Sequence, residues 1–234
     1  MKPYRKESVI AGVLFIIGTV AGISSGVVTQ PVLAATDYLQ NIAANETQWI
    51  LGTLLILLMG LPLAMVPVVL FPILRKQNEV LAIGAIVFRG VLEAVFYALL
   101  VLSMLLLLFV GQASVSSAAT DTVSYTTLGA LLLSAGDWME LILAIVFSIG
   151  SVMINLVFFQ MKIIPRWLSG WGFLGSILYF AAALVSMIGA QHLALSFDTK
   201  LGFLIGPLAL QEMVLAIWMI AKGFKPSLQA VPSL

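Results

Sequence analysis

The stretch QWILGTLLILLMGLPLAMVPVVLFPI, residues 48–73, contains no aspartate, glutamate, lysine, arginine or histidine. A helix rises 1.5 Å per residue, so about 20 apolar residues cross the roughly 30 Å of hydrocarbon in a bilayer. This stretch is long enough to be a transmembrane helix, and it sets the expectation for the rest of the chain.

The composition of the whole chain agrees with that expectation. Apolar residues make up 62% of the 234 positions and charged residues 9%, against about 45–50% and about 25% in ordinary soluble domains. So few polar residues could not cover the surface of a soluble core, whereas lipid requires no such cover. Further apolar stretches occur at 8–29, 80–111, 134–160, 170–190 and 201–222. The sequence therefore predicts an all-α integral membrane bundle of six transmembrane helices in a single domain, 1–234.

The basic residues predict the orientation of this bundle. Nine of the eleven lysines and arginines fall on one side of the predicted spans: Lys2, Arg5, Lys6, Arg75, Lys76, Lys162, Arg166, Lys222 and Lys225. Cytoplasmic loops carry such an excess, so we expect both termini in the cytoplasm and the protein in the plasma membrane. A cleaved secretory signal ending near Ala34 is the less favoured interpretation of the start, because its apolar stretch is longer than the usual 7–15 residues.

Several classes of function are disfavoured by composition. A net charge of +1 leaves no basic face for nucleic acid. With no cysteine and only His192, which we expect near the outer surface, neither a thiolate nor a multi-histidine metal site can form. We therefore expect no metal and no cofactor, and we assign no catalytic residue.

Ionisable residues inside the predicted spans are the most informative feature. Arg89 lies 13 residues beyond Lys76, and Glu212 lies 10 residues before Lys222. These separations are about 20 Å and about 15 Å along a helix, so both residues should lie near the middle of the membrane.

We expect these two residues to pair. A charge at that depth costs about 2.5–3.5 kcal/mol and usually faces a partner inside the bundle. Glu93 lies one turn after Arg89, but arginine before glutamate is the poorer order for pairing within a helix. The hypothesis is a buried network of Arg89, Glu93, Gln211 and Glu212 that binds a ligand or ion. One arginine with two carboxylates leaves a negative surplus, so either an acid is protonated or a cation binds. A purely structural pair that holds helices together is the alternative.

Other polar residues have less distinctive interpretations. Asp137 and Glu140 are expected at the outer end of the fourth span, where solvation explains them more simply than a substrate site does. Asn155 lies deeper, and an interhelical hydrogen bond is its expected role. Residues 37–47 could form a short helix capped by Asp37, and 112–127 suggest a flexible outer loop.

Glycines and prolines indicate how the spans pack. Gly18, Gly22 and Gly26 recur every four residues, which suits a helix face packed closely on a neighbour. Prolines at 62, 67, 72 and 207 predict that the second and sixth spans are kinked or interrupted. Transporters use such breaks beside intramembrane acids.

The two halves of the chain show weak similarity. Phe15 to Val20 parallels Phe147 to Val152, and Glu93-Ala94-Val95 parallels Glu212-Met213-Val214. Halves of three spans would insert in opposite directions, which would give a 3+3 inverted repeat. Chance matches in an apolar alphabet are the alternative.

Four segments resemble a bacterial multi-pass membrane family catalogued as domain of unknown function 4386. They are MKPYRKESVIAGVLFIIG (1–18), PRWLSGWG (165–172), Gly136-Asp137-Trp138, and LQEM (210–213) through Lys222-Gly223-Phe224. The resemblance spans the whole chain. It implies a multi-pass membrane protein and carries no activity or catalytic residue with it.

Three functions are left open. The first is a small transporter, channel or ligand-binding membrane protein that takes a small ion or molecule. The second is an accessory protein that assembles with itself or with another membrane protein. The third, an intramembrane enzyme, fits worst, because the residue sets of membrane proteases are absent, although acid–base chemistry by Glu93 and Glu212 stays conceivable.

Overall fold

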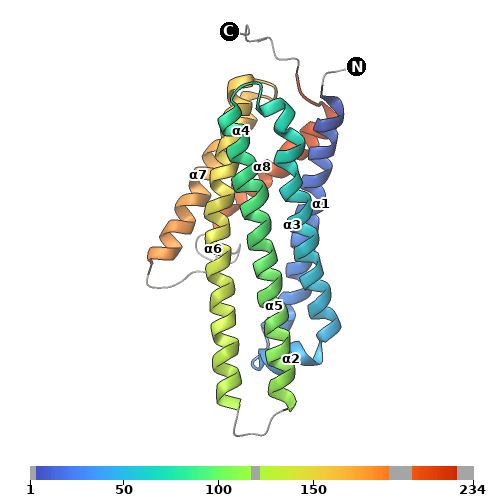
Figure 1. Ribbon diagram of the computed structural model, residues 1–234, viewed down its shortest axis with the longest axis vertical. Coiled ribbons are helices and arrows are strands. Elements are labelled where there is room, and N and C mark those ends of the chain that lie inside the picture. The colour runs from blue at the N-terminus through green and yellow to red at the C-terminus, as the bar shows by residue number, and fades with distance from the viewer. Residues whose placement is uncertain (1–3, 117–121, 190–201, 226–234) are drawn as a thin grey trace. The chain divides into compact units, whose positions relative to one another are not determined.

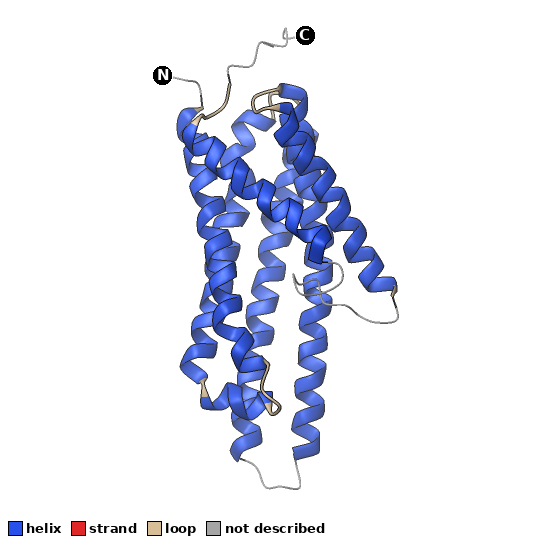
Figure 2. Cartoon of the chain, turned by 180° about the vertical axis from the view of Figure 1, so that it is seen from behind, coloured by secondary structure: helices blue, strands red, loops and turns tan. Residues whose placement is uncertain are grey.

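The computed structural model describes residues 4–116, 122–189 and 202–225, and every regular element among them is a helix (Figures 1 and 2). The elements in chain order are α1 (Arg5–Leu33), α2 (Tyr38–Ala44), α3 (Glu46–Leu74), α4 (Glu79–Ala85), the π-helix η1 (Ile86–Leu92), α5 (Glu93–Ser116), α6 (Thr122–Met161), α7 (Arg166–Ile188) and α8 (Gly202–Ala221). His192 lies outside the described residues.

Each predicted apolar stretch coincides with a helix or an unbroken run of helices. Among the described residues, five helical segments are long and apolar enough to cross a membrane: Arg5–Leu33, Glu46–Leu74, Glu79–Ser116, Ser124–Met161 and Arg166–Ile188. The sixth stretch corresponds to α8, whose apolar part, Gly206–Ala221, is shorter. The all-helical prediction is confirmed, and the apolar surfaces of these helices place the chain in a lipid bilayer.

The predicted flexible loop over 112–127 is largely wrong. Helix α5 continues to Ser116 and α6 already starts at Thr122. The serine hydroxyls near the end of α5 donate to carbonyls of their own helix, Ser114 to Gly111 at 2.7 Å and Ser116 to Gln112 at 2.9 Å. Serine and threonine satisfied in this way fit a helix, so composition alone overestimated the loop.

The short helix predicted within 37–47 is confirmed. It is α2, and the Asp37 side chain accepts a hydrogen bond from the Gln40 amide at 3.2 Å. A carboxylate at the N-cap of a helix accepts from a first-turn amide that has no partner within the helix.

The prolines do not interrupt their helices. Pro62, Pro67 and Pro72 lie inside α3, and Pro207 lies inside α8. Each proline removes one amide donor and frees a carbonyl of its own helix. Membrane helices tolerate this loss because groups of neighbouring helices can satisfy the freed carbonyl. The predicted interruption is therefore wrong, and a kink at these residues stays a prediction.

The chain divides into two compact units. Unit 1 comprises the described residues of 1–16, 62–94 and 141–234, and unit 2 those of 17–61 and 95–140.

Unit 2 has a hydrophobic core around Trp49. The buried residues of this core are Val32, Leu39, Ile42, Trp49, Leu107, Leu108 and Val110. The Trp49 indole donates to the Met104 carbonyl at 2.8 Å, so its polar atom is satisfied within the core.

The glycines of α1 do not form the single packed face that their spacing predicts. A β-carbon on Gly22 would collide with the Met59 sulfur, so this glycine does allow close packing. A β-carbon on Gly26 would meet no atom of the described residues within 4 Å. Spacing identifies a common face but not which part of that face has a neighbour.

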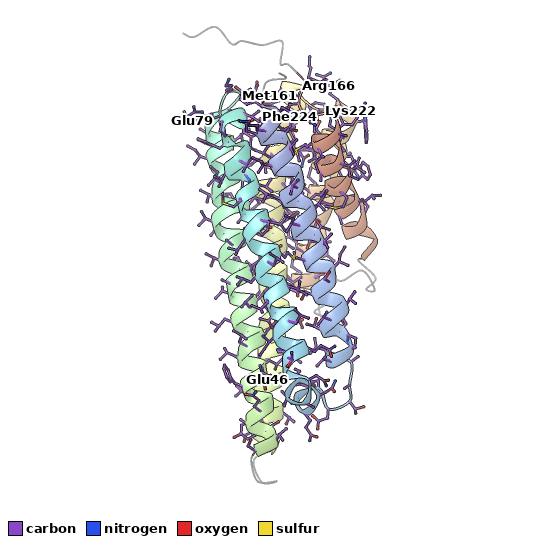
Figure 3. The ribbon with its side chains drawn as sticks, turned by 90° about the vertical axis from the view of Figure 1, so that its right-hand side faces the viewer. Glu46, Glu79, Met161, Arg166, Lys222 and Phe224 are labelled. Carbon is purple, nitrogen blue, oxygen red and sulfur yellow. The ribbon has the colours of Figure 1, made fainter. Side chains whose placement is uncertain are left out.

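In unit 1, the helix ends that carry basic residues meet at one end. Glu79, Met161, Arg166, Lys222 and Phe224 all lie there (Figure 3). The Lys225 amide donates to the Ile163 carbonyl at 2.8 Å, which joins the chain after α8 to the α6–α7 turn.

Arg5 ties the start of α1 to the end of α8. Its guanidinium donates to the carbonyls of Met219 at 3.1 Å and Ile220 at 2.6 Å. A cation at a helix C-terminus satisfies the last carbonyls and complements the helix dipole. Gly223, with φ of 69°, ends α8 in the left-handed conformation that favours glycine.

Candidate functional site

The candidate site lies in unit 1, where a π-helix carries Arg89. Helix η1 covers Ile86–Leu92 between α4 and α5, so Arg89 lies at its centre and Glu93 directly follows it. A π-helical turn inserts an extra residue into a helix and is frequent at functional sites. The insertion also rotates the residues that follow, which changes the face on which they lie.

Arg89 forms the ion pair predicted with Glu212. Its Nη2 lies 2.8 Å from Glu212 Oε1, and its Nη1 lies 3.9 Å from Glu93 Oε2. Arg89 is 1% exposed and Glu93 0%, whereas the Glu212 side chain is 13% exposed. The arginine is therefore shared between two acids, and Glu212 on α8 is the closer one.

Two aromatic rings frame the guanidinium. Its carbon lies 3.8 Å from the ring centre of Phe147 on α6 and 5.5 Å from that of Phe15 on α1. A cation over an aromatic face is stabilised by the ring quadrupole, most strongly where water is excluded. These rings keep the charge buried without adding a further negative group.

Gly150 lets α6 approach the π-helix. A β-carbon at this position would lie 2.8 Å from the backbone nitrogen of Arg89 and 2.8 Å from its Cβ. Since one of these atoms belongs to the backbone, a side-chain rotation could not relieve the clash. The absence of a side chain at Gly150 is therefore what allows the backbone of Arg89 to lie this close to α6.

Gln211 lies outside the Arg89 network. Its Nε2 donates to the carbonyl of Leu168 on α7 at 3.1 Å, and the side chain is 0% exposed. Because neighbouring residues on a helix point about 100° apart, Glu212 turns toward Arg89 while Gln211 turns toward α7. The predicted network thus splits into an ion-pair group and a separate amide.

Asn155 accompanies Gln211 rather than forming the predicted interhelical bond. Its Nδ2 donates within α6, to the Ser151 carbonyl at 2.9 Å and to Ser151 Oγ at 3.3 Å. The link from α6 to α7 at this level is made by Ser176 and Ser151, whose hydroxyls lie 2.8 Å apart. The interhelical bond at this level is therefore made by these serines. The Asn155 amide instead donates to a carbonyl of α6, the helix to which it belongs.

Asp137 and Glu140 belong to unit 2 and lie inside α6 rather than at its start. Both side chains are exposed. A helix of 40 residues is about 60 Å long, about twice the hydrocarbon thickness. An interior position in α6 is thus compatible with the outer interface predicted for both acids.

Among the described residues, no three or more His, Cys, Asp or Glu side chains form a group that could hold a metal ion. A site that uses neutral oxygens would not belong to such a group.

The apolar helices and the charges buried between them define a multi-pass helical membrane protein. The chain belongs to the family described as Domain of unknown function (DUF4386), which matches residues 10–223. Comparison with curated proteins found no match, and comparison with solved structures found none either.

Sequence reasoning missed four features of this region. Phe147 and Gly150 belong to the segment that parallels Phe15 to Val20, but nothing in that segment indicates a contact with Arg89. The π-helix gave no signal either, because its seven residues, IVFRGVL, look like any apolar helical run. Gly172 belongs to the family-like string PRWLSGWG, but a β-carbon there would collide with Asn155 of α6 and approach Gln211 of α8, and no local pattern specifies these neighbours.

Proposed function

We propose that the protein is a small transporter, channel or ligand-binding protein of the plasma membrane, with Arg89, Glu93, Gln211 and Glu212 in its binding region. The observation that carries this proposal is a buried arginine held between two carboxylates in a chain of which only 9% of the residues are charged. Intramembrane charges are costly and mark ion or substrate paths.

Stability alone is a poor explanation for this cluster. A buried ion pair loses most of its Coulomb energy to desolvation, and apolar residues of similar volume often serve as well or better. With a formal charge of +1 for Arg89 and −1 for each glutamate, the cluster carries a surplus of −1. A bound cation or a proton would neutralise that surplus, so we propose a cation or a ligand with a cationic group as its partner.

The proposed topology is six spans with both termini cytoplasmic. It is supported by the basic ends that meet at one end of unit 1 and by the alternation of lysine and arginine along the chain. The 3+3 inverted repeat stays a prediction, which a superposition of residues 8–111 on 134–222 would test.

Accessory assembly is the second candidate function. It is favoured by the open surface at Gly26, where a β-carbon would meet no atom of the described chain within 4 Å, and by Val27, which is 71% exposed. Small residues without a neighbour let a second helix approach closely. Loss of an oligomer in Gly26→Leu, with unchanged labelling at the ion-pair site described below, would support assembly as a separate role.

Thiol labelling of single-cysteine variants tests the ligand-site proposal. The chain has no cysteine, so each introduced thiol reports on one position. In Glu212→Cys, a water-filled path and the nearby Arg89 guanidinium should favour the reactive thiolate. We expect a membrane-impermeant, charged thiosulfonate to label this variant in native membranes.

Two positions on the same helix provide matched controls. Ala216 is 0% exposed and Ile217 is 60% exposed on an apolar surface. We expect no labelling of either cysteine, because the first is packed and the second faces lipid. Equal protection of all three cysteines would show that Glu212 lies in dry surroundings and would contradict the proposal.

A further inference from the structure

A second buried polar group lies in unit 1, next to the ion pair along α8. It consists of Ser151 and Asn155 on α6, Ser176 on α7 and Gln211 on α8. Gly172 lies between its two amides. A β-carbon there would collide with Asn155 Oδ1 and would lie 2.7 Å from Gln211 Nε2.

The nitrogen ends of both amides are fixed by backbone carbonyls. Asn155 Nδ2 donates to the Ser151 carbonyl, and Gln211 Nε2 donates to that of Leu168. Rotating either amide by 180° would place its oxygen against a carbonyl oxygen, so the hydrogen-bond network assigns the orientation of both. Both amide oxygens must therefore point away from these carbonyls.

Within the described part of the chain, neither Asn155 Oδ1 nor Gln211 Oε1 accepts a hydrogen bond. The residues are 3% and 0% exposed. Buried side-chain oxygens are normally satisfied, so two of them in one polar group call for a specific explanation.

The serine hydroxyls of the group already have partners. Ser176 Oγ lies 2.7 Å from the Gly172 carbonyl and 2.8 Å from Ser151 Oγ. Ser151 Oγ in turn accepts from Asn155 Nδ2 at 3.3 Å. Within the described part of the chain, no donor of this group reaches either amide oxygen, so both are available to a positively charged occupant.

We propose that the amide oxygens of Asn155 and Gln211 bind a small monovalent cation. This inference rests on the proposed function and names the ligand class for the same region. Gln211 directly precedes Glu212, and the −1 charge of the ion-pair group would hold a cation nearby. Calcium and magnesium favour sites with carboxylate ligands, whereas these two oxygens are neutral, which favours a single charge.

The location of the group suits an entry site. Asn155 lies six residues before Met161, the last residue of α6. This separation puts Asn155 about 9 Å from the basic end of unit 1. Leu168, the partner of Gln211, is the third residue of α7. A cation from that end would reach the Asn155 amide before the level of Glu212, which lies ten residues, about 15 Å, before Lys222.

Thermal unfolding of the full-length protein in mild detergent tests this site. Sodium chloride replaces choline chloride at constant ionic strength, and potassium and ammonium chloride form separate arms. For the wild type we expect a saturable rise in Tm with one of these cations, roughly 3–6 °C at ten times its Kd. Asn155→Leu and Gln211→Leu should each abolish this rise.

Ser148→Ala is the matched control. Ser148 is a buried serine on α6 that donates to its own helix, to the Ala144 carbonyl at 2.7 Å. This variant should keep the cation-dependent rise.

Two results would overturn the inference. One is a wild-type Tm that is the same in choline and in all three cation salts. This measurement uses the wild type alone, so it does not depend on whether a variant folds. The other is an unchanged rise in both leucine variants, which would show that the cation binds elsewhere. If either occurs while Glu212→Cys is still labelled from water, only the amide site fails and the proposed function stands.

Discussion

The two units of this protein differ in the kinds of polar group that they bury. In unit 2, Ser25 donates to the Gly52 carbonyl, Thr53 to Trp49 and Gln48 to Val28, each at 2.8–2.9 Å. In unit 1, the buried groups include Arg89 and Glu93, which are fully charged in their usual forms. Helix packing explains the first kind of group completely and the second kind poorly.

The acidic residues show the same difference. The acids described in unit 2 are all exposed: Asp37, Glu46, Asp137 and Glu140. Glu93 of unit 1 is 0% exposed, and it faces an arginine that is also buried. The comparison indicates that unit 2 is built for packing, whereas unit 1 accepts an energetic cost that a binding role would justify.

The largest expected effect comes from removing the central charge. Arg89→Met leaves two glutamates without their shared cation, and breaking a buried pair from one side costs about 3–5 kcal/mol. Chemical denaturation in mixed micelles should show this loss. The same assay on Ser25→Ala in unit 2 should show only about 0.5–1.5 kcal/mol, the usual value of one hydrogen bond. Equal losses would remove the contrast between the units.

A double-mutant cycle separates the pair from its surroundings. Glu212→Gln alone should destabilise, but in the Arg89→Met background it should cost less or even stabilise. We expect a coupling of roughly 1–3 kcal/mol between the two positions. Additive effects would show that the 2.8 Å contact carries no energy.

Two glycines sharpen the comparison by steric means. Gly150→Ala would push a β-carbon against the backbone of Arg89, and we expect a loss of about 1–3 kcal/mol from overpacking. Gly26→Ala meets open space on α1 and should instead stabilise by about 0.5–1 kcal/mol, because alanine suits a helix interior better. A stability assay in which both changes were neutral would contradict the close approach of α6 to the π-helix.

The smallest effect is a pH dependence in unit 2. Burial and the neighbouring Asp37 carboxylate raise the pKa of Tyr38 above its usual 10.0. The folded state then holds the phenolic proton more tightly than the unfolded state. The contribution of Tyr38 to stability is therefore constant below pH 10 and is lost as the pH rises above it.

Two variants check this assignment. Tyr38→Phe should remove part of the loss of Tm at alkaline pH. The corresponding change in the free energy of unfolding should be well below about 1 kcal/mol, because solvent screens this group. Asp37→Asn should reduce the loss too, while asparagine keeps the N-cap of α2. An alkaline loss unchanged in both variants would assign the effect to another tyrosine or to a lysine.

The depth of the charged residues could be predicted from the sequence, but their rotation could not. Counting residues from Lys76 and Lys222 placed Arg89 and Glu212 at similar levels, because the rise per residue of a helix is nearly constant. The side on which a residue lies depends on helix rotation, and the π-helix changes that rotation without changing composition. Gln211 was assigned to the ion-pair group because it adjoins Glu212 in the sequence, but adjacent residues of a helix point about 100° apart, and Gln211 lies toward Leu168.

Helix boundaries were predictable only where apolar composition changes sharply. Helix α3 starts at Glu46, within the polar segment before Trp49, and ends at Leu74, directly before Arg75. The start of α6 could not be predicted from composition, because it lies among serines, threonines and alanines, which are compatible with either a helix or a loop. Packing contacts such as those of Phe147 and Gly150 depend on neighbours from distant parts of the chain, and no local pattern specifies them.

The most direct test of the central claim is an experimental density map of the protein in lipid nanodiscs, at a resolution that shows ordered ions and water. We expect non-protein density in contact with Asn155 Oδ1, Gln211 Oε1 or the carboxylate of Glu212. Dry packing, in which protein atoms satisfy every one of these oxygens, would contradict it and leave the buried charges with a structural role alone.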